Sequence, residues 1–246
     1  MKGVMLNINP GLTIVDITHG IRPHDIREAA YSIGASFSYF PANTIHVVVV
    51  DPGVGSARRP ILVSAGHHYF IGPDNGVFSC IYTMHYDIFQ VVHITSAHYF
   101  LSPVSQTFQA RDIFAPVAAW FSRGLPVERF GNPITDFQTI VIPSPVLSQD
   151  GTVLGEVVHI DRFGNAITNI SRVEMIMLRN SARAGSLKIV LRGHNVPLKE
   201  YYEQGDGDKL YFLINSGGYI EFFLYQGSAA DTYHISLGEQ VKLLLA

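Results

Sequence analysis

The residues best placed for chemistry lie in Val47–Arg59, where an apolar run leads into an aspartate, two glycines and two arginines. Asp51 follows the run directly, and in open α/β sheets ligands bind beyond the carboxyl ends of the strands. Gly53 and Gly55 allow the backbone to turn tightly or to approach a ligand closely. Arg58 lies far enough along the chain for the loop to fold back and pair it with Asp51. The segment predicts a ligand site at a sheet rim; the alternative is an aspartate that caps a turn beside solvated arginines.

Two other polar turns have a similar character. Gly72–Ser79 contains aspartate, asparagine and glycine after a predicted strand, and Ser105–Phe114 leads into a predicted helix with Gln109, Arg111 and Asp112 near its start. The start of a helix presents free N–H groups that can bind an anion or orient a water molecule. Ordinary turn and capping chemistry is the alternative for both segments, and it is the favoured interpretation for Arg111 and Asp112.

In the second half of the chain, Ile160–Ile170 gathers polar residues around one glycine. The aromatic face of Phe163, with the amide of Asn165 two residues later, suits a purine base because the ring can stack while the amide bonds an edge. A β-bulge or a hairpin turn would explain the same pattern without any ligand.

Common nucleotide and hydrolase fingerprints are missing from the sequence. It contains no G-x-x-x-x-G-K-[ST] phosphate loop, no G-x-G-x-x-G motif after a strand and no G-x-S-x-G nucleophile motif. Eleven histidines invite a metal interpretation, but no H-E-x-x-H spacing occurs, and the adjacent His67 and His68 would face opposite sides of a strand. No metal site is therefore predicted.

Composition excludes several classes of protein. The chain has 246 residues, of which 47% are hydrophobic and 15% charged, with a formal net charge of −3, so neither a disordered chain nor a nucleic-acid binder is expected. Its first residues do not resemble a signal peptide, and its apolar runs are far shorter than the roughly 20 residues of a membrane-spanning helix. The low charge indicates either a surface covered by a partner subunit or a monomer with a large core.

The single cysteine, Cys80, cannot form an internal disulfide. A reducing cytoplasm is therefore the expected location, because disulfides are rare there. A cysteine-poor exported protein would have the same composition.

The first half of the chain alternates strand-like and helix-like segments, which indicates an α/β domain with a three-layer, mostly parallel sheet. Ile45–Val50 is β-branched and uninterrupted, as in a strand buried on both faces of a parallel sheet. Asp25–Phe40 has apolar residues at helical spacing and an acid at its start. The other predicted elements are strands at Leu12–Ile17, Pro60–Ser64 and His68–Ile71 and a helix at Asp112–Phe121.

Around Ser144–Gly151 the pattern changes to short alternating runs separated by turns. The strands predicted there are Gly155–Ile160, Ser186–Leu191, Lys209–Ile214, Tyr219–Leu224 and Gln240–Leu245. Val173–Arg179 is expected to form one or two helical turns at most. We therefore predict an α/β domain over residues 1–147 and an all-β domain over residues 148–246.

Together these motifs resemble the S-adenosylmethionine hydroxide adenosyltransferases, the S-adenosylmethionine hydrolases, a family that also contains the fluorinases and chlorinases. The matching stretches run in family order across nearly the whole chain: Met1–Gly3, Ile17–Gly20, Val50–Arg58, Gly72–Gly76, Thr107–Ala118, Asp161–Ile170 and Asn215–Ala230. The resemblance implies an α/β domain followed by a β-barrel-like domain. It also implies a homotrimer in which the substrate binds between the N-terminal domain of one subunit and the C-terminal domain of the next.

The resemblance implies a reaction at the ribose C5′ of S-adenosylmethionine, in which water or hydroxide attacks in line and methionine leaves. The sulfonium is already a good leaving group, so no cofactor is expected, and the difficulty lies in placing the water and accepting its proton. An aspartate, an arginine and a histidine line the water site of the family's hydrolases. Asp51 and Arg58 match the first two, whereas Gln109 stands at the histidine position, and an amide cannot take a proton near neutral pH.

The resemblance also carries contacts to the adenine base onto this sequence. Phe163 would stack near the base, and Asn165 would hydrogen-bond its edge. The backbone near Gln226 would meet the adenine amino group.

The rest of the substrate would be held by three further side chains. Asp161 and Ser216 would bind the methionine ammonium and carboxylate, and His24 stands where the halogenases have a tryptophan against the ribose. Gly217 follows where the halogenases have an arginine, which predicts weaker or different binding of the carboxylate.

Two departures from the family pattern keep other functions open. Gln109 replaces the histidine, and the acidic turn that precedes M-K-G in family chains and holds the ribose diol is not in this sequence, so we expect the natural chain to be longer. A non-catalytic binder of adenosine or S-adenosylmethionine would show the same departures. Adenosyl transfer to a halide or another small nucleophile is a third function, against which Asp51 argues because the halogenases have no acid there.

Overall fold

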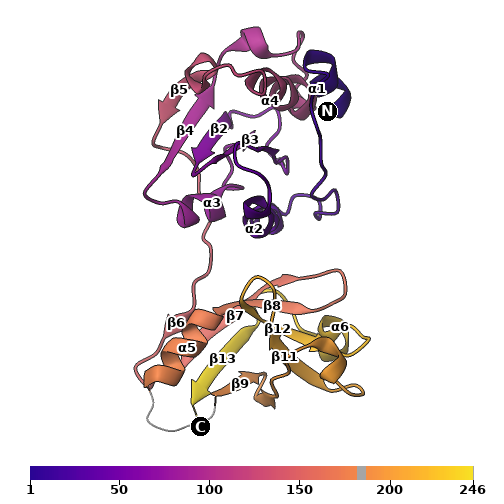
Figure 1. Cartoon of the computed structure of the whole chain (residues 1–246), viewed down its shortest axis with the longest axis vertical. Coiled ribbons are helices and arrows are strands. Elements are labelled where there is room, and N and C mark those ends of the chain that lie inside the picture. Colours follow the sequence, from indigo (N-terminus) through magenta and orange to yellow (C-terminus); the bar gives the residue numbers. More distant parts are fainter. Residues whose placement is uncertain (182–186, 246) are drawn as a thin grey trace. The chain divides into compact units, whose positions relative to one another are not determined.

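The computed structural model describes residues 1–181 and 187–245, and the chain divides into two compact units, Met1–Ile142 and Pro143–Ala246 (Figure 1). The division falls earlier than the predicted boundary at residue 147. The reason is that β6 (Val146–Leu147) pairs antiparallel with β7 (Val153–Ile160) and so belongs to the second unit.

The first unit contains a mixed five-stranded sheet in the order β1-β3-β2-β4-β5. Its strands are β1 (Ile45–Val47), β2 (Pro60–Ala65), β3 (His68–Pro73), β4 (Phe89–Ile94) and β5 (Gly131–Ile134). Only β1 and β3 are parallel, and the other three pairings are antiparallel, so the prediction of a mostly parallel sheet is not confirmed. The main reason is the two-residue turn at Gly66-His67, because such a short connection can join only antiparallel strands.

Helices cover both faces of this sheet. On one face lie α1 (Lys2–Ile8) and α4 (Ala115–Phe121), and on the other lie α2 (Ile26–Ser36) and α3 (Ser79–Met84) (Figure 1). Alternate residues of β2 point to opposite faces, so Leu62 packs in the α1–α4 core while its neighbours Ile61 and Val63 pack in the α2–α3 core. The short helical turns of this unit are η1 (Phe37–Tyr39), η2 (Ala97–Tyr99), the π-helical η3 (Ala110–Phe114) and η4 (Val127–Arg129).

The helix predicted at Asp25–Phe40 is confirmed as α2 and η1. Asp25 is the N-cap, and its carboxylate accepts the backbone N–H of Glu28 at 2.9 Å. Capping of this kind stabilises a helix by about 1 kcal/mol. Ala29, Ala30 and Ile33 then place one apolar face against the core.

One strand prediction in the first unit is wrong, and another is wrong in part. Leu12–Ile17 is not a strand, although Leu12 packs on the core while Val15 and Ile17 are exposed, which explains its strand-like alternation. Ile45–Val50 forms a strand only as far as Val47, and β1 lies at the edge of the sheet, so its residues after His46 are only half-buried.

The second unit is an antiparallel sheet that curls into a nearly closed barrel, in the order β10-β9-β13-β7-β8-β12-β11. Its remaining strands are β8 (Ala166–Ser171), β9 (Leu187–Leu191), β10 (His194–Val196), β11 (Leu210–Ile214), β12 (Tyr219–Leu224) and β13 (Gln240–Leu245). A bridge between Leu198, just after β10, and Phe212 in β11 brings the two ends of the sheet together. The predicted strands of this half are thus confirmed, except that Ser186 lies outside the described residues.

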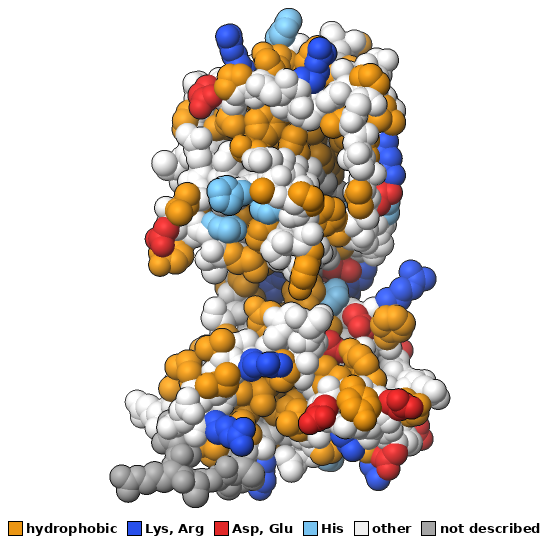
Figure 2. All heavy atoms as spheres, viewed as in Figure 1, with side chains coloured by type: hydrophobic (Ala, Val, Ile, Leu, Met, Phe, Trp, Pro, Cys, Tyr) orange, Lys and Arg blue, Asp and Glu red, His pale blue; other side chains and the backbone are white. Residues whose placement is uncertain are grey.

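Helical segments of the second unit are α5 (Arg172–Ser181), η5 (Tyr202–Gln204) and α6 (Ala229–Tyr233). At ten residues α5 is longer than the one or two turns predicted, because Met175 and Leu178, three residues apart, both bury against the barrel core. Its Val173, Ile176 and Met177 are exposed, and hydrophobic side chains are also visible on the surfaces of both units in Figure 2. No helix within residues 1–181 and 187–245 is long and apolar enough to cross a membrane.

Candidate functional site

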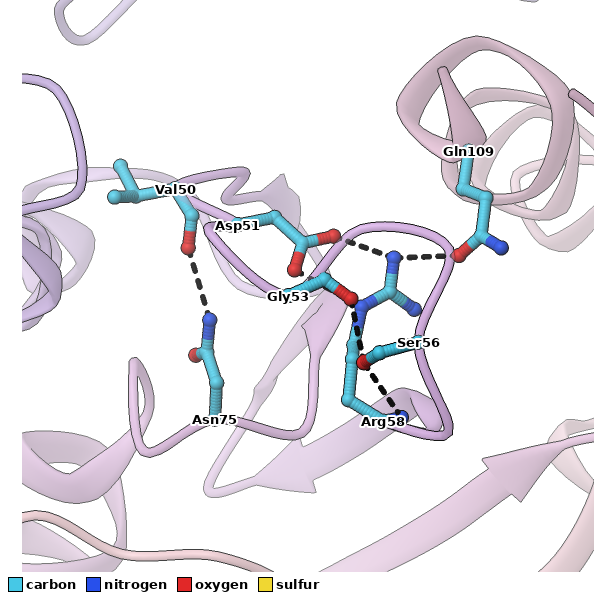
Figure 3. A network of polar contacts seen from close by, with 7 residues as sticks. All are labelled: Val50, Asp51, Gly53, Ser56, Arg58, Asn75 and Gln109. Atoms are coloured by element: carbon cyan, nitrogen blue, oxygen red, sulfur yellow. Dashed lines mark hydrogen bonds and ion pairs between the residues drawn. The ribbon is translucent and has the colours of Figure 1, made fainter. Parts of the chain in front are cut away.

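Asp51 and Arg58 form a buried ion pair in the first unit, just beyond the carboxyl end of β1 (Figure 3). Arg58 Nε donates to Asp51 Oδ1 at 3.0 Å, and Nη2 donates to Oδ2 in a second, shorter contact. The two side chains are only 5% and 9% exposed. The pairing predicted from their spacing therefore forms, with the two-point geometry that an arginine can give to a carboxylate.

The loop between them folds back through local hydrogen bonds. Val54 N–H bonds the carbonyl of Asp51 at 3.2 Å, and Ser56 Oγ donates to the carbonyl of Gly53 at 2.7 Å. Ser56 Oγ in turn accepts the backbone N–H of Arg58 at 3.2 Å. These contacts turn the loop back on itself, so that Arg58 reaches Asp51 although the two lie seven residues apart in the sequence.

Gly55 allows this loop to approach the next polar segment. Its φ is +80°, and a Cβ at this position would lie 2.3 Å from the carbonyl oxygen of Gln106. A side chain is therefore excluded both by conformation and by space. The approach brings the loop beside the segment that carries Gln109.

Gln109 joins the pair from a distant part of the sequence. Its Oε1 accepts a hydrogen bond from Arg58 Nη2 at 2.5 Å, and it immediately precedes η3 (Figure 3). The amide oxygen is therefore engaged by the guanidinium. Gln109 therefore contacts Arg58, the residue that pairs with Asp51.

Arg58 also packs against an aromatic ring, and one of its guanidinium nitrogens lacks a hydrogen-bond partner among the described residues. Its guanidinium carbon lies 5.2 Å from the ring centroid of the fully buried Phe114, in a cation–π contact. Its Nη1 is buried and has no hydrogen-bond partner among the described residues. Buried donors are nearly always satisfied, so this atom marks a place where a water or a ligand atom would bind.

Arg111 and Asp112 make ordinary structural contacts, as favoured from the sequence. Asp112 Oδ2 accepts the backbone N–H of Ser105 at 2.8 Å, and Arg111 Nε donates to Oδ1 at 2.6 Å. The Arg111 hydrogen bond holds the pKa of the Asp112 carboxyl below its usual value. This acid stays ionised and orders the turn that leads to Gln109.

In the second unit, Asp161 organises the loop predicted to meet the purine. Its Oδ1 accepts the backbone N–H groups of Phe163 and Asn165, both at 2.9 Å, and its Oδ2 accepts Asn165 Nδ2 at 3.1 Å. Gly164 has a φ of +82°, and a Cβ there would lie 2.0 Å from Ser228 Oγ. The ring of Phe163 is 77% exposed, so its face is free to stack.

The remaining predicted contacts are exposed and lie in turns. Ser216 sits in the β11–β12 turn, Gln226 follows β12 with a φ of +54°, and His24 precedes α2 with a φ of +68°. The 161–165 loop and the segment after Gln226 are joined, because Ala230 N–H bonds the carbonyl of Gly164 at 2.8 Å.

A buried acid in the second unit was missed by the sequence analysis. Glu221 accepts the hydroxyl of Tyr202 at 2.6 Å and the amide of Asn215 at 3.1 Å. Burial and the hydrogen bond to Glu221 raise the pKa of Tyr202. Asn215 Oδ1 also accepts the N–H groups on the turn that carries Ser216, so the network shapes that turn. The signal in the sequence that could have revealed this network is Glu221 itself, an acid within the otherwise apolar run of β12.

Within the described part of the chain, no three histidine, cysteine, aspartate or glutamate side chains come close enough together to hold a metal ion. The polar groups gathered around Asp51 are one carboxylate, one guanidinium and one amide. Such a set can orient a water molecule and accept its proton, and it can do so without a metal.

Both units of the chain match models of known protein domains. Residues 1–131 match the model of the SAM hydroxide adenosyltransferase N-terminal domain, and residues 155–242 match that of the C-terminal domain. The chain is 33% identical to an (R)-S-adenosyl-L-methionine hydrolase of Thermus thermophilus, over 99% of this chain and 92% of the relative. It is 26% identical to a fluorinase of an Actinoplanes species, over 100% of this chain and 92% of the relative.

A solved structure gives the same result for the fold. The crystal structure of an uncharacterized conserved protein from Thermotoga maritima aligns with a TM-score of 0.89 at 30% sequence identity. The alignment covers 99% of this chain and 93% of that one.

Proposed function

We propose that this chain, which belongs to the SAM hydroxide adenosyltransferase family, hydrolyses S-adenosylmethionine at ribose C5′ to adenosine and L-methionine. The observation that carries the proposal is the hydrogen-bonded series from Asp51 through Arg58 to Gln109. It supplies a carboxylate to take a proton and a fixed cation to hold that carboxylate in place.

Asp51 is the proton acceptor in this proposal. Each carboxylate oxygen accepts one bond from Arg58 and keeps a further lone pair for a water molecule. Attack forms the C5′–O bond while the C5′–S bond breaks, and sulfur takes the bonding electrons to become the thioether of methionine. The proton of the attacking water passes to Asp51. Because the pair is nearly buried, few bulk waters compete for its hydrogen bonds.

Gln109 has a supporting role. Its oxygen bonds Arg58, which leaves the amide NH₂ as the group free to donate to the water oxygen. It cannot accept the water proton, so the step relies on Asp51 alone where family hydrolases have a histidine as well. No cofactor enters this scheme, because the sulfonium leaves without protonation.

Substrate recognition is assigned chiefly to the second unit. The exposed face of Phe163 would stack on adenine and Asn165 would bond its edge, with the backbone near Gln226 at the amino group. Asp161 and Ser216 would hold the methionine end of the substrate. His24, in the first unit, would contact the ribose.

The protein would work as a homotrimer in the cytoplasm, with each substrate between the first unit of one subunit and the second unit of the next. Exposed apolar side chains such as Val173, Ile176 and Met177 support a surface that a partner subunit covers. The single Cys80 fits a reducing compartment.

A non-catalytic binder of S-adenosylmethionine or adenosine is the second candidate, favoured by the amide of Gln109 at the position of a proton-accepting histidine. Chromatography of the protein incubated with S-adenosylmethionine separates the functions. Adenosine and methionine in equal amounts support hydrolysis, unchanged substrate supports the binder, and a 5′-substituted adenosine formed with added halide supports halide transfer.

A further inference from the structure

The loop that carries Asp51 leaves the sheet before it reaches the site. β1 ends at Val47, and the last backbone bond to its neighbour β3 runs from Val48 N–H to the carbonyl of Ile71 at 3.0 Å. The ladder therefore does not fix the backbone at Val50 and Asp51. Something else must hold it, because a carboxylate that places a water needs a rigid support.

The turn at Gly72–Gly76 supplies that support at the start of the loop. Asn75 Nδ2 donates to the carbonyl oxygen of Val50 at 2.9 Å, one residue before Asp51 (Figure 3). Asn75 Oδ1 accepts the N–H of Val77 at 3.2 Å, so both ends of the amide are engaged. A side chain bonded at both ends has little freedom to move, and it passes that rigidity to Val50.

The same turn also holds the other end of the loop, at Arg59. Asp74 N–H bonds the carbonyl of Arg59 at 2.8 Å, and the Asp74 carboxylate accepts Arg59 Nε at 2.9 Å. The Asp74 side chain is only 2% exposed, and its other oxygen accepts the N–H of Gln138 at 2.7 Å. Arg59 is adjacent to Arg58, so the two neighbouring arginines are each fixed by an aspartate.

Two glycines of this turn lie in close contacts, Gly72 against the segment that leads into the Asp51 loop and Gly76 against Ile140. A Cβ at Gly72 would lie 2.4 Å from the carbonyl oxygen of Val48, and Gly76 has a φ of +92° with a would-be Cβ 2.6 Å from Ile140 Cγ2. The sequence G-P-D-N-G thus suits a turn that holds both ends of the Asp51–Arg58 loop, which we call the clamp. None of its side chains need touch the substrate.

We propose that Asn75 and Asp74 are positioning residues, which hold the two ends of the loop so that Asp51 and Arg58 stay aligned for the water. This rests on the proposed hydrolysis. Removing the Asn75 clamp would free the carbonyl of Val50 and with it the Asp51 backbone. A displacement of about 1 Å at a reacting group can lower a rate by roughly 100-fold.

Asn75→Ala is the test, with Asn9→Ala as its matched control. Asn9 makes the same pattern of bonds in the first unit, accepting the N–H of Gly11 at 3.2 Å and donating to Ser122 Oγ at 2.9 Å. We expect Asn75→Ala to lower kcat about 10- to 100-fold with KM for S-adenosylmethionine within two-fold of wild type. Asn9→Ala should change neither constant, although both variants lose comparable stability.

A purely structural role would move the melting temperature of both variants and the kcat of neither. An Asn75→Ala enzyme with wild-type kcat, or with a higher KM and unchanged kcat, overturns the proposal. If Asn75→Ala does not fold, Asn75→Asp replaces it. That variant keeps the acceptor for Val77 and the shape of the side chain, but presents an oxygen to the carbonyl of Val50.

A crystal structure of the Asn75 variant separates this inference from the proposed function. If wild-type protein forms no adenosine, hydrolysis is wrong, but the clamp is still tested by the distance from Asp51 to Arg58. We expect that pair to be broken or shifted in the variant. An unchanged two-point pair would overturn the clamp whatever the activity.

Discussion

At the scale of single residues, the proposed hydrolysis depends on which group takes the proton. Asp51 is held by two bonds from Arg58, and Gln109 bonds the same guanidinium from the other side. The amide therefore stabilises the cation and donates, but does not accept a proton. The rate of hydrolysis should therefore change when position 109 carries a residue that can accept a proton.

Gln109→His should increase hydrolysis about ten-fold, because a ring nitrogen adds a second acceptor beside Asp51, and general base catalysis contributes 10²–10⁴-fold when it acts alone. The measurement is the rate of adenosine release at saturating S-adenosylmethionine. Gln106→His, at an exposed position in the same segment, is the control and should leave the rate unchanged. If Gln109→His leaves the rate unchanged while Asp51→Asn keeps wild-type turnover, the proposed activation of water at this site is wrong.

At the scale of elements, the site is made by the close approach of two loops. Gly55→Ala should lower both stability and activity, because the residue has a φ of +80° and its Cβ would meet the carbonyl of Gln106 at 2.3 Å. Gly124→Ala is the control, since its φ is +87° and nothing lies within 4 Å. Both variants bear the left-handed strain of about 1–2 kcal/mol. Only Gly55→Ala should also lose adenosine formation, by at least about ten-fold, in the same assay.

A histidine pair in the same sheet should make the stability depend on pH. Burial, and to a smaller extent the neighbouring His68, lowers the pKa of His46 to about 4, against about 6.5 in an unfolded chain. Between these values the unfolded state binds more protons, so stability is full above about pH 6.5 and falls as the pH drops toward 4. The melting temperature should decline over that window. His46→Phe, which keeps an aromatic ring against Phe70, should flatten the decline, whereas His67→Gln should not.

The sequence predicted local features of these elements well. Asp25 as a helix cap and the return of Arg58 onto Asp51 depend on residues a few positions apart, where spacing restricts what the chain can do. The direction of the strands depended on whether a connection was a hairpin or a helical crossover, and the turn at Gly66 was not recognised as a hairpin. The contact from Arg58 to Gln109 spans 51 residues, a separation at which local pattern carries no information.

At the scale of the whole molecule, the two units hold different parts of the proposed chemistry. The residues of the proposed water site, Asp51 and Arg58, lie in the first unit, and those of the proposed adenine contacts lie in the second. In the proposed homotrimer each active site combines the first unit of one subunit with the second unit of another. Sedimentation should therefore give a trimer, and a monomer that is fully active would contradict the assembly.

Mixed trimers test that arrangement more sharply. Asp51→Asn and Phe163→Ala subunits should each be nearly inactive alone. After joint unfolding and reassembly in equal amounts, about a quarter of the sites would combine an intact first unit with an intact second unit from a neighbour, because pairing at a head-to-tail interface is random. Recovered adenosine formation near that fraction supports the shared site. No recovery from correctly assembled mixed trimers would contradict it.

The most direct test of the central claim is the rate at which Asp51→Asn forms adenosine in isotopically labelled water, compared with wild type. Wild-type protein should place one labelled oxygen on the adenosine 5′ position and none on methionine, because water attacks C5′ and sulfur leaves. Asp51→Asn should be slower by at least about 100-fold, since the amide cannot accept the water proton. Wild-type turnover by Asp51→Asn, or adenosine without the label, would contradict the account.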